Sequence, residues 1–277
     1  MKKHITFRVG GPAACFLTPS TKEQIREILH ICQEEKTPYF ILGNGSNLLV
    51  SDQGFDGVVL QVYKNMNQMA VEGEHLRVQA GALLSATARK ALEAGLTGME
   101  FAAGIPGTMG GAAVMNAGAY GGEMKQIVES VTVLTMGGEE KMLSGEESAF
   151  AYRTSVYQTL PCVIVKAVLR LQPGDPETIG QTMRTLMKKR KASQPLELPS
   201  AGSTFKRPTG YFAGPLIEQA GLKGCGVGGA EVAKKHAGFI VNTGGATAED
   251  IKKTIAMVQS RVWETSGVRL EPEVRIW

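Results

Sequence analysis

Two glycine-rich runs contain the residue types that bind a ligand through the backbone. The first spans 43–47 (GNGSN), directly after the apolar run 39–42, and the second spans 104–122 (GIPGTMGGAAVMNAGAYGG). Glycine reaches positive φ without steric cost and lets the backbone come close to a ligand. Successive backbone N–H groups in such turns form a concave nest that binds an anion, typically phosphate. Two nests in one half of the chain therefore indicate a ligand with two linked phosphates, such as a dinucleotide.

Neither run is the G-x-G-x-x-G fingerprint that opens a helix in dinucleotide-binding βαβ units. The first run is followed by Leu48, where that pattern needs a third glycine, and the residues after it read as strand or turn. An alternative stays open at this point, namely that both runs are only tight turns of a sheet-rich protein.

Composition is that of an ordinary globular protein. The chain has 277 residues, which favours two or three domains, with 43% hydrophobic and 20% charged residues. The net charge is only +4 and no lysine-arginine stripe is interleaved with aromatic residues, so nothing indicates nucleic-acid binding. The four cysteines are far apart and the four histidines share no ligand spacing, so we expect reduced thiols and no metal site. The N-terminus lacks the apolar segment of a signal peptide and no run is long enough to span a membrane, so we expect a cytoplasmic protein.

Periodic patterns predict helices and strands around the first glycine run. Residues 20–23 (STKE) form a capping box and open a helix. The apolar face of this helix consists of Ile25, Ile28, Leu29 and Cys32. A strand at 38–42 follows and leads into the glycine run. Further strands are predicted at 57–62, 75–79, 128–136 and 162–171, with a helix of small residues over 84–94.

The second half of the chain begins at a break in the pattern, 173–176 (PGDP), where we place a domain boundary. A helix is predicted over 177–191, and its basic end 188–191 (KKRK) is interpreted as a solvated end favoured by the helix dipole. The last helix starts at Thr247, and strands are predicted at 239–242 and 268–276. The core-facing residues of this last helix are Ile251, Ile255, Val258 and Val262. Together these elements predict an α+β protein.

The order and spacing of several motifs identify a family, which composition alone does not. They are 4–11 (HITFRVGG), the two glycine runs, 116–121 (NAGAYG), 151–155 (AYRTS), 194–208 (QPLELPSAGSTFKRP), 221–224 (GLKG), 236–242 (HAGFIVN) and 273–275 (EVR). Over nearly its whole length the chain resembles the UDP-N-acetylenolpyruvoylglucosamine reductases, the flavoenzyme family of peptidoglycan precursor synthesis. It resembles the branch that lacks an extra tyrosine loop over the substrate. Because it begins almost directly at the first motif, we expect part of the family's N-terminal region to lie outside this sequence.

The resemblance implies a vanillyl-alcohol-oxidase (PCMH)-type fold, not a Rossmann fold. It implies an FAD-binding domain over 1–172, made of two subdomains at about 1–56 and 57–172 that hold FAD between them. A smaller α+β substrate-binding domain is implied over 173–277, with the C-terminal strand that carries Glu273 returning to the active site. The implied partner is a UDP-sugar, with NADPH as electron donor and no membrane insertion, and we expect a monomer.

The implied reaction reduces the enolpyruvyl ether of UDP-N-acetylglucosamine to the lactyl ether of UDP-N-acetylmuramate. Hydride passes from N5 of FAD to the terminal carbon, charge builds on the carboxylate, and a proton reaches the carbon bearing the ether. By resemblance, Ser203 is the proton donor, Arg153 stabilises the developing charge, and Glu273 assists that intermediate or orients Arg153. Taken alone, each has an ordinary alternative: a turn-capping serine, a surface arginine and a solvated glutamate.

The same resemblance implies which residues bind the ligands. The cofactor-binding residues are Gly43, Asn44, Gly45, Ser46, Asn47, Gly104, Ile105, Gly107, Gly110, Gly111, Asn116, Gly118 and Ala119, and the substrate-binding residues are Tyr152, Tyr157 and Lys206. Two points stay open, because Tyr157 can pack instead of touching substrate, and the polar side chains of 44–47 can satisfy their own turn instead of binding phosphate.

Two other functions compete with this reading. One is an oxidase on the same flavin scaffold, which often tethers its flavin covalently, although the motifs 202–208 (GSTFKRP) and 272–275 (PEVR) speak against it. The other is a nucleotide-binding module without catalysis, which predicts binding of flavin or UDP-sugar without NADPH turnover.

Overall fold

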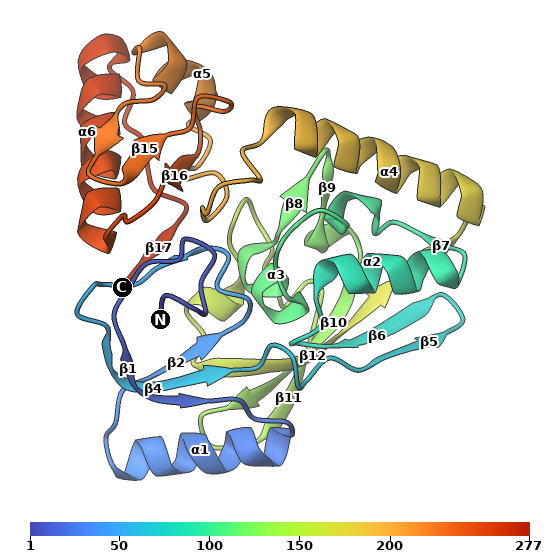
Figure 1. The fold of residues 1–277 in the computed structure, drawn as a ribbon. Coiled ribbons are helices and arrows are strands. Elements are labelled where there is room, and N and C mark those ends of the chain that lie inside the picture. The colour runs from blue at the N-terminus through green and yellow to red at the C-terminus, as the bar shows by residue number, and fades with distance from the viewer. The chain divides into compact units, whose positions relative to one another are not determined.

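The computed structural model describes every residue from Met1 to Trp277, and the chain forms two compact units (Figure 1). The sheet unit comprises 15–44 and 57–190, and the terminal unit comprises 1–14, 45–56 and 191–277. Each unit is therefore built from segments that are distant in sequence, and the first glycine run crosses from one unit to the other after Asn44.

A five-stranded antiparallel sheet forms the centre of the sheet unit, in the order β11-β10-β12-β6-β5. Val133 of β10 lies opposite Lys141 of β11 on one side and Ile164 of β12 on the other. The strands are β5 (Met69–Glu72), β6 (His75–Gln79), β10 (Val128–Thr135), β11 (Glu140–Ser144) and β12 (Cys162–Arg170). Strands β6, β10 and β12 were predicted at these positions within one residue, because short runs of apolar and β-branched residues favour strands.

Both faces of this sheet are covered. Successive side chains of a strand point to opposite faces, so Ile164 packs into the cluster that contains α2 (Leu84–Glu93) and α3 (Met109–Met115). Val163 and Val165 pack into a second cluster with Ile25 and Leu29 of α1 (Lys22–Glu34). Figure 1 shows α1 on one side of the strands and α2 and α3 on the other.

A smaller three-stranded sheet has the order β1-β4-β2, with β1 (Ala13–Leu17), β2 (Tyr39–Leu42) and β4 (Phe55–Gln61). Strands β2 and β4 are parallel, with Leu42 opposite Gln61. The remaining elements of the sheet unit are β7 (Leu96–Thr97), β8 (Gly118–Ala119), β9 (Gly122–Glu123), β13 (Gln172–Pro173), α4 (Pro176–Ser193) and the 3₁₀ helices η1 (Glu100–Ala102), η2 (Met124–Gln126) and η3 (Val156–Gln158).

The terminal unit packs its last helix, α6 (Ala248–Ser266), against a three-stranded antiparallel sheet of order β14-β15-β16. The carboxylate of Asp52 accepts hydrogen bonds from the backbone N–H groups of Ala248 (2.8 Å) and Glu249 (3.0 Å), which fixes segment 45–56 to the start of this helix. The other elements are α5 (Ala213–Gln219), β14 (Gly226–Val227), β15 (Ala230–Val232), β16 (Ile240–Asn242), and the parallel pair β3 (Leu48–Leu49) and β17 (Arg275–Ile276).

The helix predictions are confirmed in type and in their buried faces, while local details differ. In α6 the predicted core face is buried and Thr247 caps the helix. In α1 the cap is one residue later than predicted: Thr21 accepts from Gln24 N–H, and the Gln24 side chain accepts from Ser20 N–H. The predicted strand 268–276 is wrong except at its end, because 271–273 pairs with the loop at 204–206 and only Arg275–Ile276 forms a strand.

The predicted boundary at 173 falls before α4, whereas the compact sheet unit extends through α4 to Arg190. The reason is local packing, because Ile179 is buried, Met183 packs against the main core cluster, and Gly174 N–H donates to Gly95 O (2.8 Å). The functional division at 172/173 stays a prediction, since compactness does not test where ligands bind.

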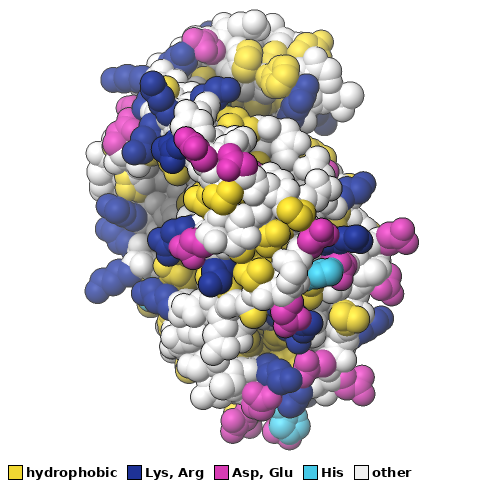
Figure 2. Space-filling model, turned by 90° about the vertical axis from the view of Figure 1, so that its right-hand side faces the viewer, with side chains coloured by type: hydrophobic (Ala, Val, Ile, Leu, Met, Phe, Trp, Pro, Cys, Tyr) yellow, Lys and Arg dark blue, Asp and Glu magenta, His cyan; other side chains and the backbone are white.

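Surface features add little to the assignment. No helix is both long and apolar enough to cross a membrane, and no three His, Cys, Asp or Glu side chains are grouped to hold a metal ion. All four cysteines are free thiols. On the lower part of the face drawn in Figure 2, acidic and basic side chains are mixed, with hydrophobic side chains between them.

Candidate active site

The first glycine run connects β2 to β3, and its backbone donors are unused. Gly45 has φ +62°, and a Cβ at this position would lie 2.4 Å from the carbonyl oxygen of His4, so only glycine fits. The backbone N–H groups from Asn44 to Asn47 donate to no protein acceptor. Four consecutive free donors in a partly buried loop form an anion-binding nest, which the tight-turn alternative does not require.

The start of this run contacts the second glycine run within the sheet unit. The Asn44 side-chain amide donates to Pro106 O at 2.8 Å, and a Cβ at Gly43 would lie 2.5 Å from Thr108 Oγ1. The amide of Asn47 donates instead to Glu273 O at 3.1 Å, within the terminal unit. Both asparagines therefore brace neighbouring segments, and neither satisfies its own turn. Direct contact of Asn44, Ser46 and Asn47 with FAD stays a prediction.

The second run differs, because the protein itself uses most of its donors. Met109 N–H donates to Ala82 O and Gly110 N–H donates to Ala80 O, both at 2.8 Å, while Thr108 Oγ1 caps Gly111 N–H. Gly104, Gly107 and Thr108 keep free N–H groups. A Cβ at Gly110 would lie 3.1 Å from the Ala80 Cβ, so this glycine serves the close packing of α3 on the segment after β6.

Asn116, a predicted cofactor ligand, has a structural environment of its own. It caps α3 in the left-handed conformation (φ 41°), and its side chain is fully buried. Its amide donates to Glu123 and to Ala151 O, and its Oδ1 accepts from Lys125 N–H. Through these bonds the Asn116 side chain holds the β8–β9 hairpin and the turn at Ala151 in place, and its contact with FAD stays a prediction.

Three other predicted cofactor residues have structural environments of their own. Ile105 packs against the main core cluster of the sheet unit. Gly118 pairs with Glu123 in the β8–β9 hairpin, where a Cβ would lie 2.7 Å from Gly122 O, and Ala119 pairs with Gly122. Their contact with FAD stays a prediction.

Arg153 lies in a tight turn that is held from several sides. Its φ is +53°, which is rare for a residue with a side chain and is found at functional sites. Ala151 and Thr154 pair across the turn, and the Gln158 amide donates to Arg153 O at 2.9 Å. The guanidinium donates to Gly118 O at 3.0 Å and lies 5.3 Å from the ring centre of Tyr152. The turn thus fixes the direction of the half-buried Arg153 side chain.

Ser203 and Glu273 come together in the terminal unit through the backbone. Phe205 and Pro272 form an antiparallel bridge, and Glu273 N–H donates to Thr204 O at 2.8 Å. Thr204 is fully buried, and its hydroxyl accepts from Ile240 N–H, which anchors this turn to β16. Ser203, just before this anchor, is exposed, and its hydroxyl has no protein partner.

The three predicted substrate residues have different environments. Tyr152 is 52% exposed. Lys206 forms an ion pair with Glu271, beside the Ser203 turn. Tyr157 is buried, its hydroxyl is 2.7 Å from that of Ser148, and burial raises the pKa of its phenol. Tyr157 thus packs in the sheet unit, and its contact with substrate stays a prediction.

Sequence reasoning missed Arg190. In the basic run 188–191, interpreted as solvated, Arg190 alone is buried, beside Gly104 of the second glycine run. A signal was present, because Arg190 follows Met183 and Met187 at helical spacing on the apolar face of α4.

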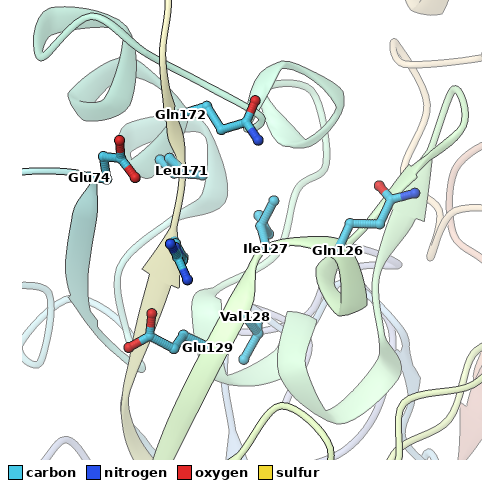
Figure 3. Close-up of a pocket in the computed structure, with 8 residues that line it drawn as sticks. Glu74, Gln126, Ile127, Val128, Glu129, Leu171 and Gln172 are labelled. Atoms are coloured by element: carbon cyan, nitrogen blue, oxygen red, sulfur yellow. The ribbon is translucent and has the colours of Figure 1, made fainter.

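A separate pocket of about 360 Å³ lies near the ends of β6, β10 and β12 (Figure 3). Glu74, Ile127, Glu129 and Leu171 are among its lining residues, and none of the predicted site residues belongs to it. It is therefore distinct from the glycine runs.

The residues of the glycine runs fit FAD. The N–H groups of Asn44 to Asn47 are free, and so, within the sheet unit, are those of Gly107 and Thr108. Each such donor can bind an anionic oxygen without displacing a protein bond, as a phosphate of FAD requires. Family comparison agrees, since the model described as "FAD binding domain" matches residues 13–144. Fold and site together define an FAD-binding oxidoreductase with an α+β fold of the PCMH type, as predicted.

Full-length relatives are similar to the whole chain. The family model described as "UDP-N-acetylenolpyruvoylglucosamine reductase, C-terminal domain" matches residues 194–277. Curated proteins named UDP-N-acetylenolpyruvoylglucosamine reductase are 50% identical in Clostridium novyi (strain NT) and 49% identical in Caldanaerobacter subterraneus, with all of this chain and 90% and 91% of theirs covered. A crystal structure of the reductase of that name from Thermus caldophilus is 38% identical, with a TM-score of 0.85 over 100% of this chain and 96% of that chain. The chain belongs to the UDP-N-acetylenolpyruvoylglucosamine reductase family.

Proposed function

We propose that this enzyme reduces the enolpyruvyl ether of UDP-N-acetylglucosamine to UDP-N-acetylmuramate, with NADPH as the electron donor. The names of its relatives support the substrate, and the fit of the glycine runs supports the cofactor. We expect the reaction to take place in the cytoplasm and the enzyme to act as a monomer.

FAD, when bound, accepts electrons from NADPH and supplies hydride to the substrate. Arg153 pairs its guanidinium fork with the substrate carboxylate, where negative charge develops as hydride adds, and such charge-assisted pairs are the strong ones. Ser203 donates its hydroxyl proton to the carbon that bears the ether, and Glu273 stabilises the same charged intermediate or orients Arg153. Lys206 and Tyr152 bind the UDP-sugar, with Lys206 as a point charge.

The backbone pair between Thr204 and Glu273 carries this proposal. It brings Glu273 close to Ser203, which directly precedes Thr204, although the two are distant in sequence. The Ser203 hydroxyl stays exposed and unpaired, as a proton donor to an incoming substrate must be. A serine that merely capped a turn would use its oxygen within the protein.

The first test is an anaerobic visible spectrum of the purified protein. We expect NADPH to bleach the flavin absorbance, and UDP-N-acetylglucosamine enolpyruvate to restore it promptly. Bleaching without recovery would keep the flavoenzyme but reject this substrate. Flavin that stays attached after acid denaturation would favour a covalent oxidase, and absence of NADPH turnover would favour a binding module.

Ser203→Ala tests the proton donor within the same experiment. The flavin should bleach with NADPH as in the parent, but its recovery with substrate should slow by a factor of about 100 or more, the usual contribution of a positioned acid. Thr209→Ala is the matched control, because it removes an exposed hydroxyl six residues away. Recovery of Ser203→Ala at the parent rate would reject Ser203 as the donor.

A further inference from the structure

Arg190 is a buried cation on an otherwise apolar helix face. It is 9% exposed in the last turns of α4, while Lys188, Lys189 and Lys191 beside it are exposed. Met183, one of the residues on this face, packs against the main core cluster. The chain thus places a guanidinium where the pattern of α4 calls for a hydrophobic side chain.

The Arg190 side chain makes no ion pair and no hydrogen bond within the chain. Its nitrogen atoms are not among the fully enclosed polar atoms that lack a partner, so the guanidinium keeps some access to solvent or to a ligand. Burial lowers the pKa of Arg190, and only the phenol of Tyr120, which lies in the turn of the β8–β9 hairpin, counteracts this effect. A largely buried charge without a protein partner is unfavourable, and an anionic ligand would offset this cost.

The position of Arg190 points to the second glycine run. A Cβ on Gly104 would lie 3.0 Å from Arg190 Cδ and 3.7 Å from its Nε, so the absence of a side chain at Gly104 makes room for the arginine. The Gly104 N–H also donates to no protein group. A free cation and a free donor therefore lie together where the glycine run begins.

The favourable dipole at a helix C-terminus is the ordinary explanation for an arginine in this position. It accounts for exposed cations, because such a group gains from the dipole while remaining hydrated. It does not account for a guanidinium that is buried and bonded to none of the last carbonyls. One of these, Lys191 O, instead accepts from Lys235 Nζ at 2.6 Å.

We propose that Arg190 neutralises negative charge on bound FAD at the Gly104 end of the second glycine run. The proposal rests on the proposed function in one respect, that FAD is the ligand. FAD has two sources of negative charge: its diphosphate, which is charged in every redox state, and its ring system, which gains charge on reduction. A buried guanidinium can pair with either through its fork of donors.

The two sources give different results in Arg190→Met, which removes the charge and keeps an apolar stem. Two quantities are measured on the purified holoenzyme: the rate of FAD release on dilution, followed by FAD fluorescence, and the midpoint potential of the flavin, followed against a reference dye. Lys188→Met is the matched control, because it removes an exposed charge two residues away on the same helix.

If Arg190 pairs with the diphosphate, Arg190→Met should release FAD about 10-fold faster or more, with an unchanged potential, because both redox states lose the same interaction. If it pairs with the reduced ring, release of oxidised FAD should stay within about 3-fold. The reduced form should then become about 100-fold less favoured, a fall of about 60 mV for a two-electron couple. Either result supports the proposal and identifies the partner.

Parent values for both quantities in Arg190→Met would overturn the proposal. If that variant does not fold, Arg190→Lys decides, because it keeps the charge but lacks the fork: a smaller change of the same kind supports the proposal and parent values reject it. A parent protein that binds no FAD at all would instead refute the proposed function, so the two failures are distinguishable.

Discussion

The two glycine runs look alike in sequence but use glycine for different reasons. In the first run, Gly45 adopts positive φ and the N–H groups of 44–47 remain free. In the second, the donors of Met109, Gly110 and Gly111 are already bonded within the protein, and Gly110 lets α3 pack against Ala80. The first run keeps its donors available to a ligand, whereas the second is mainly a packing element with a few free donors at its start.

This difference teaches how a glycine-rich signal should be interpreted. Glycine content indicates that the backbone comes close to something, but not whether that partner is a ligand or another part of the chain. The fate of each N–H decides between the two, because a donor bonded to a carbonyl in the protein is not available to a phosphate. Variants of each run can break or sharpen this comparison.

The largest effect is expected for Gly45→Val. The variant forces a β-branched residue into positive φ with its Cβ 2.4 Å from His4 O, so FAD should bind at least about 100-fold more weakly. Gly73→Val is the control, because Gly73 has a similar φ of +59° and open space around it. This control should keep FAD and lose about 1–2 kcal/mol of stability. Full FAD content in Gly45→Val, measured by absorbance, would show that the first run is not the nest.

A smaller effect is expected for Asn116→Ala, which acts on the turn behind the second run. The variant removes three side-chain hydrogen bonds of a fully buried amide and should lower the free energy of unfolding by about 3 kcal/mol. Chemical denaturation measures this change. Asn116 holds Ala151 in the turn that carries Arg153. The rate of flavin reoxidation by substrate should therefore change more than the rate of FAD release. A variant that retains parent stability but loses FAD would support the prediction that Asn116 is a cofactor ligand.

Gly110→Ala should lower stability by about 1 kcal/mol, since its Cβ must push against Ala80. Gly111→Ala, at the next position of the same helix, is the matched variant: its Cβ would meet only Thr108 Oγ1 at 3.5 Å. It should gain up to about 1 kcal/mol from the higher helix propensity of alanine. Thermal melts of both holoenzymes check the contrast. Equal losses of FAD affinity in Gly110→Ala and Gly45→Val would remove the distinction between the runs.

The smallest effect concerns thiol reactivity. Burial raises the pKa of Cys162 to about 11, so at pH 8 only about one thiol in a thousand is ionised. With a thiol reagent at pH 8, exposed Cys15 and Cys225 should react and Cys162 should not. Its resistance should persist after FAD is removed, because α3 packs on β12 within the main core cluster. Rapid labelling in the apoprotein would mean that FAD holds the second run closed.

Much of the fold follows from local sequence patterns. The strands at 75–79, 128–136 and 162–171 and the apolar faces of α1 and α6 are predictable, because apolar runs and helical spacing involve residues that are near one another in sequence. The cap of α1 was wrong by one residue, since Ser20 and Thr21 are both good caps. The predicted strand at 268–276 was wrong for most of its length, because its partners lie at 204–206.

The sequence by itself determined the family, which segments form helices or strands, and which loops are glycine-rich. These features depend on residue types and their spacing. Only the tertiary structure decided which backbone donors stay free, that Tyr157 packs and Asn116 is enclosed, and that Arg190 is buried. The physical reason is that burial and hydrogen-bond satisfaction depend on neighbours that are distant along the chain. A residue's type shows what it can bind, and the folded chain decides what it has already bound.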